Sequence, residues 1–170
     1  GNSYVLFIGL DKLIKNSNMK PEEIYIKMLN LLKCYNLNNL DNKLIFFSDE
    51  KLTWGFTINT FAKLYNEQFE LTVEETIYKL WGDNYYDSKK MMWLDFKKSD
   101  IKRSFCQYIL VPLKQLHNSI ILNNTSRINE ILDFFRIDIC KFNNNFELNE
   151  FLCELTPFNL NFGKFIYNNI

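Results

Sequence analysis

Leu80-Trp81-Gly82-Asp83-Asn84-Tyr85-Tyr86 is the stretch of the sequence that ends one predicted helix and begins the next predicted element. The helix begins upstream at Thr72-Val73-Glu74-Glu75, which has the pattern of a capping box. Gly82 stands where the C-terminus of a helix takes the left-handed conformation. We expect Trp81 to anchor this helix end by packing rather than to bind a ligand, because burying a large aromatic side chain contributes about 2–3 kcal/mol.

The residues that follow this stretch predict a β-hairpin. Tyr85-Tyr86-Asp87 and Met91-Met92-Trp93-Leu94 flank the polar turn Ser88-Lys89-Lys90. Further on, residues 97–103 form a polar, basic connector. The connector has the charge to contact phosphate, but a solvated loop is the favoured interpretation.

The N-terminal part of the chain predicts a βαβ unit. Residues 4–10 read as a fully buried strand, Pro21 opens a helix, and residues 44–47 read as a second buried strand that ends at Ser48. Asp11 directly follows the first strand. Ligands of open α/β sheets bind at the carboxyl ends of strands, although a helix or turn cap explains Asp11 equally well.

The remaining elements are predicted to be mostly helical. We expect an amphipathic helix from Thr57, a long helix capped by Ser104 and kinked at Pro112, and a short helix from Thr125. The C-terminal region predicts a strand, a helix that stops before a proline, and a last short helix, over residues 137–140, 146–155 and 158–170.

Composition narrows the possible functions. The chain has 170 residues, 47% of them hydrophobic, and a formal net charge of +0, so a surface that is basic all round is not indicated, whereas a local basic patch stays open. No apolar run approaches the ~20 residues of a membrane span, and no signal-peptide pattern is visible, so we expect neither a membrane partner nor secretion. The four cysteines have no C-x-x-C spacing and the one histidine is His117, so we expect reduced thiols and no zinc site.

Motifs for nucleotide binding and catalysis are missing from the sequence. The five glycines form neither the phosphate loop G-x-x-x-x-G-K-[ST] nor G-x-G-x-x-G. One histidine and scattered acids do not assemble into a catalytic dyad or triad. We therefore expect the chain itself to be non-catalytic.

Three stretches together resemble the elongation factor two family of translational GTPases. The first is the strand with Asp11 and Pro21-Glu22-Glu23-Ile24-Tyr25, and the second is Trp54-Gly55-Phe56-Thr57-Ile58 with Phe61-Ala62-Lys63-Leu64-Tyr65. The third is the stretch quoted at the start, followed by Arg103-Ser104-Phe105-Cys106-Gln107-Tyr108-Ile109-Leu110-Val111-Pro112. The resemblance begins near Tyr4 and weakens after Leu122.

The resemblance implies an α/β plus α+β fold made of part of a Ras-like G domain and its inserted G prime subdomain. Residues 1–70 would be the C-terminal portion of the G domain and residues 71–145 the G prime-like α+β subdomain. Residues 146–170 would be the return to the G domain and the start of the linker to the next domain. The phosphate loop, both switches and the Mg²⁺ ligands would precede Tyr4. The full-length parent would then be a GTPase that uses GTP or GDP with magnesium, and no cofactor is expected for this chain alone.

The resemblance also implies two residues at the guanine site. Asp11 matches the last residue of the family's Asn-Lys-x-Asp motif and would pair with the guanine edge, and Ser48 would belong to the guanine loop. Ile8 and Gly9 stand in place of the Asn-Lys pair, and Asp49-Glu50 replace the rest of the family's Ser-Ala turn. Each missing hydrogen-bond partner typically costs ~1–3 kcal/mol, which puts guanine specificity in question.

Several functions fit this resemblance. The first is a GTPase acting on the ribosome, in large-subunit maturation, which the sequence matches best, or in translation elongation. The alternatives are the spliceosomal GTPase paralogue, a degenerate GTPase scaffold that mediates protein or RNA interactions, and an interaction domain unrelated to ribosomes. The expected partners are the large ribosomal subunit or another ribonucleoprotein and proteins, with no membrane and no DNA, in the cytoplasm or the nucleus. An incomplete G-domain sheet would expose strand edges and apolar surface, which predicts aggregation, dimerisation or a covering helix.

Overall fold

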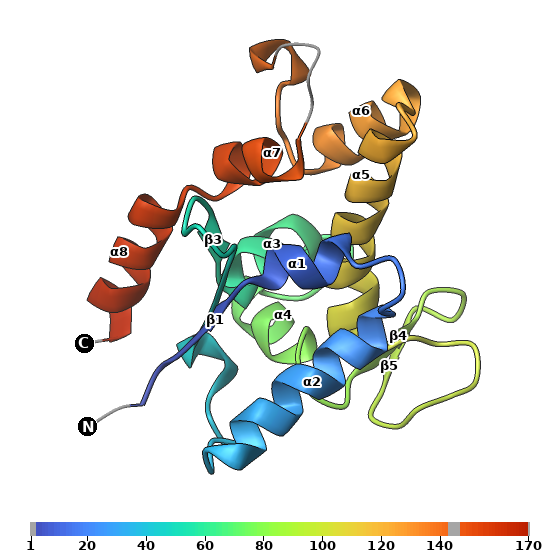
Figure 1. The fold of residues 1–170 in the computed structure, drawn as a ribbon. Coiled ribbons are helices and arrows are strands. Elements are labelled where there is room, and N and C mark those ends of the chain that lie inside the picture. Colours follow the sequence, from blue (N-terminus) through green and yellow to red (C-terminus); the bar gives the residue numbers. More distant parts are fainter. Residues whose placement is uncertain (1–2, 143–146, 170) are drawn as a thin grey trace.

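The computed structural model describes residues 3–142 and 147–169, and within them the chain has a mixed, helix-rich α/β fold with one three-stranded and one two-stranded sheet (Figure 1). The strands are β1 (Val5–Ile8), β2 (Ile45–Ser48), β3 (Gly55–Phe56), β4 (Tyr85–Asp87) and β5 (Met92–Leu94). The α-helices are α1 (Leu10–Lys15), α2 (Pro21–Cys34), α3 (Ile58–Tyr65), α4 (Val73–Lys79), α5 (Val111–Ile121), α6 (Thr125–Phe134), α7 (Leu148–Leu155) and α8 (Phe158–Asn169). Two 3₁₀ turns and one π-helix complete the elements, namely η1 (Asn42–Leu44), η3 (Ile139–Lys141) and η2 (Cys106–Leu110). None of the helices in the described residues is long and apolar enough to cross a membrane.

The predicted βαβ unit is confirmed. β1 and β2 are parallel, with Val5 opposite Ile45 and Ile8 opposite Ser48, and α1 and α2 lie in the connection between them. β3 pairs with β2 in the antiparallel direction, so β2 is the central strand and all four of its residues are buried.

The prediction that the first strand is fully buried is wrong. β1 is the edge strand, and Leu6 and Ile8 are 36% and 56% exposed. On the same face of the sheet, the ring of Phe46 in β2 lies 5.3–5.6 Å from the rings of three phenylalanines of α8, which are Phe158, Phe162 and Phe165. Helix α8 therefore covers the central strand but leaves this face of β1 open.

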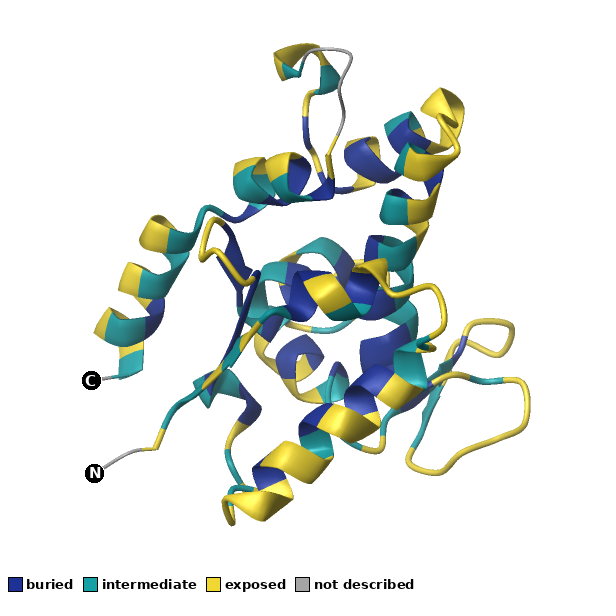
Figure 2. Cartoon of the chain, in the orientation of Figure 1, coloured by how far each residue is buried: buried dark blue, intermediate teal, exposed yellow. Residues whose placement is uncertain are grey.

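The opposite face of the sheet packs on the main core. The ring of Phe47 lies 5.2 Å from that of Phe56 and 5.5 Å from that of Phe105. Figure 2 shows the buried residues gathered where α1, α3, α4 and α5 meet, with exposed residues on the outward side of α2. The core thus joins the βαβ unit to the elements after residue 70.

Both ends of α4 have the predicted geometry. The Thr72 hydroxyl accepts a hydrogen bond from the Glu75 N–H at 3.1 Å, and the Glu75 carboxylate accepts one from the Thr72 N–H at 2.8 Å. Gly82 has a φ of 75°, in the left-handed region that glycine adopts without strain. Trp81 is half-buried, with its ring 4.9 Å from those of Tyr25 and Phe105, so it anchors the turn as predicted.

The connector prediction is wrong at its last residue. Lys97, Lys98 and Lys102 are exposed, as expected, but Arg103 is only 7% exposed. Its Nη1 donates to the Gly82 carbonyl and to the Asp83 carboxylate, both at 2.7 Å. Arg103 therefore fixes the glycine turn to the body of the protein.

The same guanidinium also links this turn to α2. Nε of Arg103 donates to Oε1 of Glu22 at 3.1 Å, and the guanidinium lies 4.4 Å from the centroid of the Tyr25 ring and 5.3 Å from that of Tyr85. A planar cation satisfies carboxylates at its edge and aromatic rings on its faces at once, which explains why this site is built around arginine.

The long helix predicted from Ser104 begins differently. The Ser104 hydroxyl donates to the Lys79 carbonyl at 2.5 Å and does not cap a helix. A π-helix precedes α5, with the Val111 N–H bonded to the Cys106 carbonyl, and Pro112 then occupies the first turn of α5. The sequence predicts a kink at Pro112. The irregularity in this region is instead the π-helix that precedes α5, and Pro112 itself lies in the first turn of α5, where proline is tolerated.

The C-terminal region follows the predictions except for one strand. The predicted strand at residues 137–140 is wrong, because the Asp138 carboxylate accepts the Cys140 N–H at 2.9 Å and turns the chain into η3. Helices α6 and α8 lie where expected, while α7 begins at Leu148. The predicted start of that helix, Phe146, lies outside the described residues.

Candidate functional site

The carboxyl ends of β1 and β2 bring together the two residues singled out from the sequence. The Gly9 N–H donates to the Ser48 carbonyl at 3.0 Å, which extends the strand pairing by one step. Gly9 has a φ of 93°, and a Cβ built on it would meet no atom within 4 Å, so its backbone conformation rather than crowding favours glycine. This turn starts α1 directly after β1 and places Asp11 in the first turn of that helix.

Asp11 faces the loop that follows β2. Its side chain is 7% exposed, and Oδ1 accepts the backbone N–H of Glu50 at 3.0 Å. The Glu50 side chain in turn forms an exposed ion pair with Lys12 at 2.8 Å, and this hydrogen bond raises the pKa of the Lys12 ammonium. One oxygen of Asp11 is thus engaged by the protein, and Oδ2 accepts no hydrogen bond from the described residues.

Ser48 is buried beneath this loop. Its hydroxyl donates to the Asp49 carbonyl at 3.1 Å, and the side chain has no exposed surface. The Ser48 hydroxyl is therefore buried and engaged within the protein.

Asp49 is the structural centre of the loop, whereas from the sequence it counted only as a departure from the family's Ser-Ala turn. The residue is fully buried, and Oδ1 accepts the N–H groups of Thr53 at 2.7 Å and Trp54 at 3.1 Å. Oδ2 accepts the Thr53 hydroxyl at 2.6 Å. An Asp followed four residues later by Thr in a short loop was the available signal, because such side chains commonly bond nearby backbone groups.

The carboxyl ends of β1 and β2 present few side chains that could bind a ligand. Ile8 and Gly9 occupy the positions where the resemblance expects an amide and an ammonium group, and neither supplies a donor in its side chain. Oδ2 of Asp11 accepts no hydrogen bond from the described residues and could accept one from an N–H donor, although the residue is only 7% exposed. Among the described residues, no group of three or more His, Cys, Asp or Glu side chains is placed to hold a metal ion.

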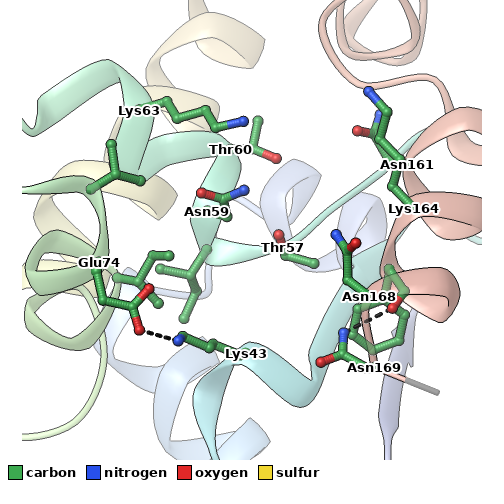
Figure 3. Close-up of a pocket in the computed structure, with 14 residues that line it drawn as sticks. Lys43, Thr57, Asn59, Thr60, Lys63, Glu74, Asn161, Lys164, Asn168 and Asn169 are labelled. Atoms are coloured by element: carbon green, nitrogen blue, oxygen red, sulfur yellow. Dashed lines mark hydrogen bonds and ion pairs between the residues drawn. The ribbon is translucent and has the colours of Figure 1, made fainter.

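A separate polar cleft lies between α8 and the helices beside it (Figure 3). It has a volume of about 730 Å³ and is lined by residues of η1, α3, α4 and α8. Figure 3 shows Thr60 and Lys63 on the α3 wall and Asn161 and Lys164 on the facing α8 wall. No sequence pattern indicates this cleft, because it forms only when α8 packs near α3 and α4.

The charges of this cleft are partly neutralised. Lys43 pairs with Glu74, and that hydrogen bond raises the pKa of the Lys43 ammonium. Lys63 and Lys164 form no ion pair with the described residues. The cleft suits a polar or anionic group, but it holds no nucleophile with an adjacent base among the residues that line it.

Cys106 and His117 are two further groups whose surroundings shift their pKa values. Burial raises the pKa of the Cys106 thiol, which also donates to the Glu22 carboxylate at 3.2 Å, so the reactive thiolate is disfavoured. Burial lowers the pKa of His117, and the charges of Lys15 and Lys114 lower it further. A scan of the sequence against models of known protein families finds no match.

Proposed function

We propose that the chain is a non-catalytic portion of an elongation factor two-like GTPase that acts on the ribosome. In this proposal the β1–α2–β2 unit is the last part of the G domain, and the elements after α3 include its G prime subdomain. The observation that carries the proposal is the placement of Asp11 and Ser48 at the same end of two adjacent parallel strands, linked by the bond from the Gly9 N–H to the Ser48 carbonyl. Residues that read one base together require this proximity.

The open edge of β1 supports the same proposal. In the described residues β1 pairs with β2 alone, and its Leu6 and Ile8 side chains are exposed on the face that α8 leaves uncovered. A strand with one free edge and apolar side chains is expected where further strands of a larger sheet would pair.

A degenerate GTPase used as a scaffold is the second candidate, and a specific observation favours it. The side chain of Ile8 is 56% exposed where an amide would have to contact the base, and one Asp11 oxygen already accepts the Glu50 N–H. A base that pairs with both Asp11 oxygens would have to share Oδ1 with the Glu50 N–H.

Nuclear magnetic resonance separates these two candidates, because it detects weak binding and the Glu50 amide reports on Asp11 directly. If the sheet edge still reads guanine, GDP shifts the amide signals of Glu50 and Lys12, whereas ADP does not, and Asp11→Ala abolishes the response. If the parent is a scaffold, neither nucleotide shifts these signals in the wild-type chain.

Affinity capture of the tagged chain from cytoplasmic and nuclear extracts tests the ribosomal part of the proposal. Co-purification of large-subunit proteins and assembly factors is the expected result. Spliceosome components would instead assign the chain to the spliceosomal paralogue, and the absence of both classes above background would contradict the proposal.

A further inference from the structure

The β4–β5 hairpin and the connector after it carry a group of lysines on the side of the molecule opposite α8 (Figure 1). Lys89 and Lys90 lie in the hairpin turn, and Lys98 and Lys102 lie in the connector. All four line one concavity of about 540 Å³, which we call the lysine concavity. Lysines separated along the chain thus line one shared space.

The positive charge of the lysine concavity is not neutralised by ion pairs. None of its four lysines forms a salt bridge with the residues that the structure describes. The lining contains two carboxylates, and one of them, Asp87, uses Oδ1 to accept the N–H groups of Lys89 at 3.1 Å and Lys90 at 3.2 Å. The other is Asp100, so four cations face two carboxylates, in a protein whose formal net charge is +0.

The rest of the lining supplies aromatic and amide groups. The half-buried rings of Tyr86 and Tyr108 lie 6.3 Å apart, and Gln107 adds a side-chain amide that bonds no other described residue. Burial raises the pKa of Tyr108 to about 12, so its phenol stays neutral at physiological pH and does not repel an anion. Proteins that bind single-stranded nucleic acid combine basic groups with aromatic rings, since the cations contact phosphates and the rings stack on bases. The lysine concavity has both, and the Gln107 amide adds a group that can bond a base edge.

We propose that the lysine concavity binds single-stranded RNA. Lysines on two sides of the concavity contact the phosphate backbone, and the tyrosine and glutamine side chains contact bases. Both tyrosine rings also pack on Phe69 at 4.9 Å, so they are held in fixed positions beside the lysines. An acidic protein segment would use the lysines but has no bases to contact these rings and the amide. Binding of free RNA at this surface is independent of the guanine-reading edge at Asp11, so the two proposals fail or succeed separately.

The test uses the full chain and a fluorescent oligouridylate of about 12 nucleotides. With four lysine–phosphate contacts, the logarithm of the binding constant should fall with the logarithm of the salt concentration with a slope of about −3, which is roughly a 50-fold loss for a fourfold rise in salt. The variant K89Q/K90Q/K98Q/K102Q should bind at least ~10-fold more weakly, with a slope near zero.

The matched control removes the same charge elsewhere. K15Q/K27Q/K33Q/K51Q replaces four exposed lysines outside both the lysine concavity and the polar cleft beside α8, and should keep the wild-type affinity and slope. Equal losses in both variants would show charge-driven binding without a site and would overturn the proposal. Crosslinking of RNA that contains 4-thiouridine should label the peptide that holds Tyr86 or Tyr108, and labelling confined to other peptides would also overturn it.

Two competing ligands complete the experiment. The exposed Met91, Met92 and Phe96 side chains flank the lysines, so anionic lipid vesicles and polyaspartate are tested beside RNA. Binding of either one as tightly as RNA, with the same dependence on the four lysines, would replace the RNA assignment by a membrane or an acidic protein partner.

Discussion

The guanidinium of Arg103 lies 4.4 Å from the centroid of the Tyr25 ring, across 78 positions of sequence (103 − 25). The arginine comes from the connector after the hairpin and the tyrosine from α2, so this contact joins the two parts that the sequence resemblance assigns to different subdomains. The Tyr25 hydroxyl also accepts the Gly82 N–H at 3.1 Å. The glycine turn, the arginine and the tyrosine therefore hold one another in place.

Replacement of Arg103 by methionine should destabilise the protein by about 1–3 kcal/mol, because the Gly82 carbonyl loses its donor and the Tyr25 ring loses its cation. Chemical denaturation measures the change. The neighbouring Lys102→Met removes the same charge at an exposed position and should change the free energy of unfolding by less than about 0.5 kcal/mol. Equal effects of the two substitutions would show that the Arg103 network contributes no stability.

Gly55→Ala and Gly163→Ala should change stability in opposite directions. A Cβ on Gly55 would lie 2.2 and 2.5 Å from two ring atoms of Phe46, which α8 holds in place, and such overpacking costs about 1–3 kcal/mol. A Cβ on Gly163 in α8 meets no atom within 4 Å, and alanine favours a helix over glycine by roughly 0.5–1 kcal/mol. Thermal melts of the two variants check this, and a stabilised Gly55→Ala would mean that α8 moves away from Phe46.

The capping box at the start of α4 should contribute measurable stability. Thr72→Ala removes the oxygen that accepts the Glu75 N–H and should cost about 1 kcal/mol by denaturant titration. Thr72→Ser keeps a hydroxyl that fills the same role and is the control, with an expected loss of a few tenths of that value. Indistinguishable alanine and serine variants would contradict the capping role.

Glu75 should make stability depend on pH in the acidic range. The N–H of Thr72, and secondarily its hydroxyl, bond the carboxylate and lower the pKa of Glu75 from 4.5. Because the folded-state pKa is the lower one, the stabilisation is present above 4.5 and is lost as the pH falls through the folded-state value. Glu75→Gln should therefore flatten the dependence of unfolding free energy on pH, whereas Glu67→Gln, at an exposed residue without an ion pair in the described chain, should not.

The cysteines should differ in their rates of alkylation. Cys34 and Cys140 are exposed and should react with iodoacetamide in the native protein. Cys106 is buried and its pKa is raised by that burial, so it should react only after unfolding. Mass spectrometry of digested protein gives the labelled positions, and labelling of Cys106 at the rate of Cys34 would indicate that α2 and η2 separate in solution.

Local sequence patterns predicted the elements whose determinants are close together in the chain. The Thr72–Glu75 capping box, the left-handed Gly82, the hairpin and the parallel pairing of β1 with β2 are all confirmed. The proximity of Asp11 to the loop after Ser48 followed from that pairing, because the carboxyl ends of parallel strands meet at one edge.

The wrong predictions concern residues whose state depends on distant partners. An apolar run at residues 4–10 reads as a buried strand, but burial of β1 depends on how far α8 reaches across the sheet. The basic composition of the connector predicts a solvated loop. Arg103 is nevertheless buried, because its guanidinium bonds Glu22 and packs on Tyr25, both of which lie in α2. The strand predicted at residues 137–140 fails for a local reason, since Asp138 bonds the backbone of Cys140 and the alternation of apolar residues does not reveal it.

The two ends of the described chain meet, because the Tyr4 ring lies 5.8 Å from the Phe165 ring and the Tyr4 hydroxyl donates to the Asn169 carbonyl. A contact between residues 4 and 165 closes a loop of nearly the whole chain, and the entropy lost on closing a loop rises with its length. We expect this contact to form late in folding, after the local helices and the hairpin. The same contact can open without exposing the main core beneath Phe47, so α8 and β1 should exchange their amide hydrogens faster than β2.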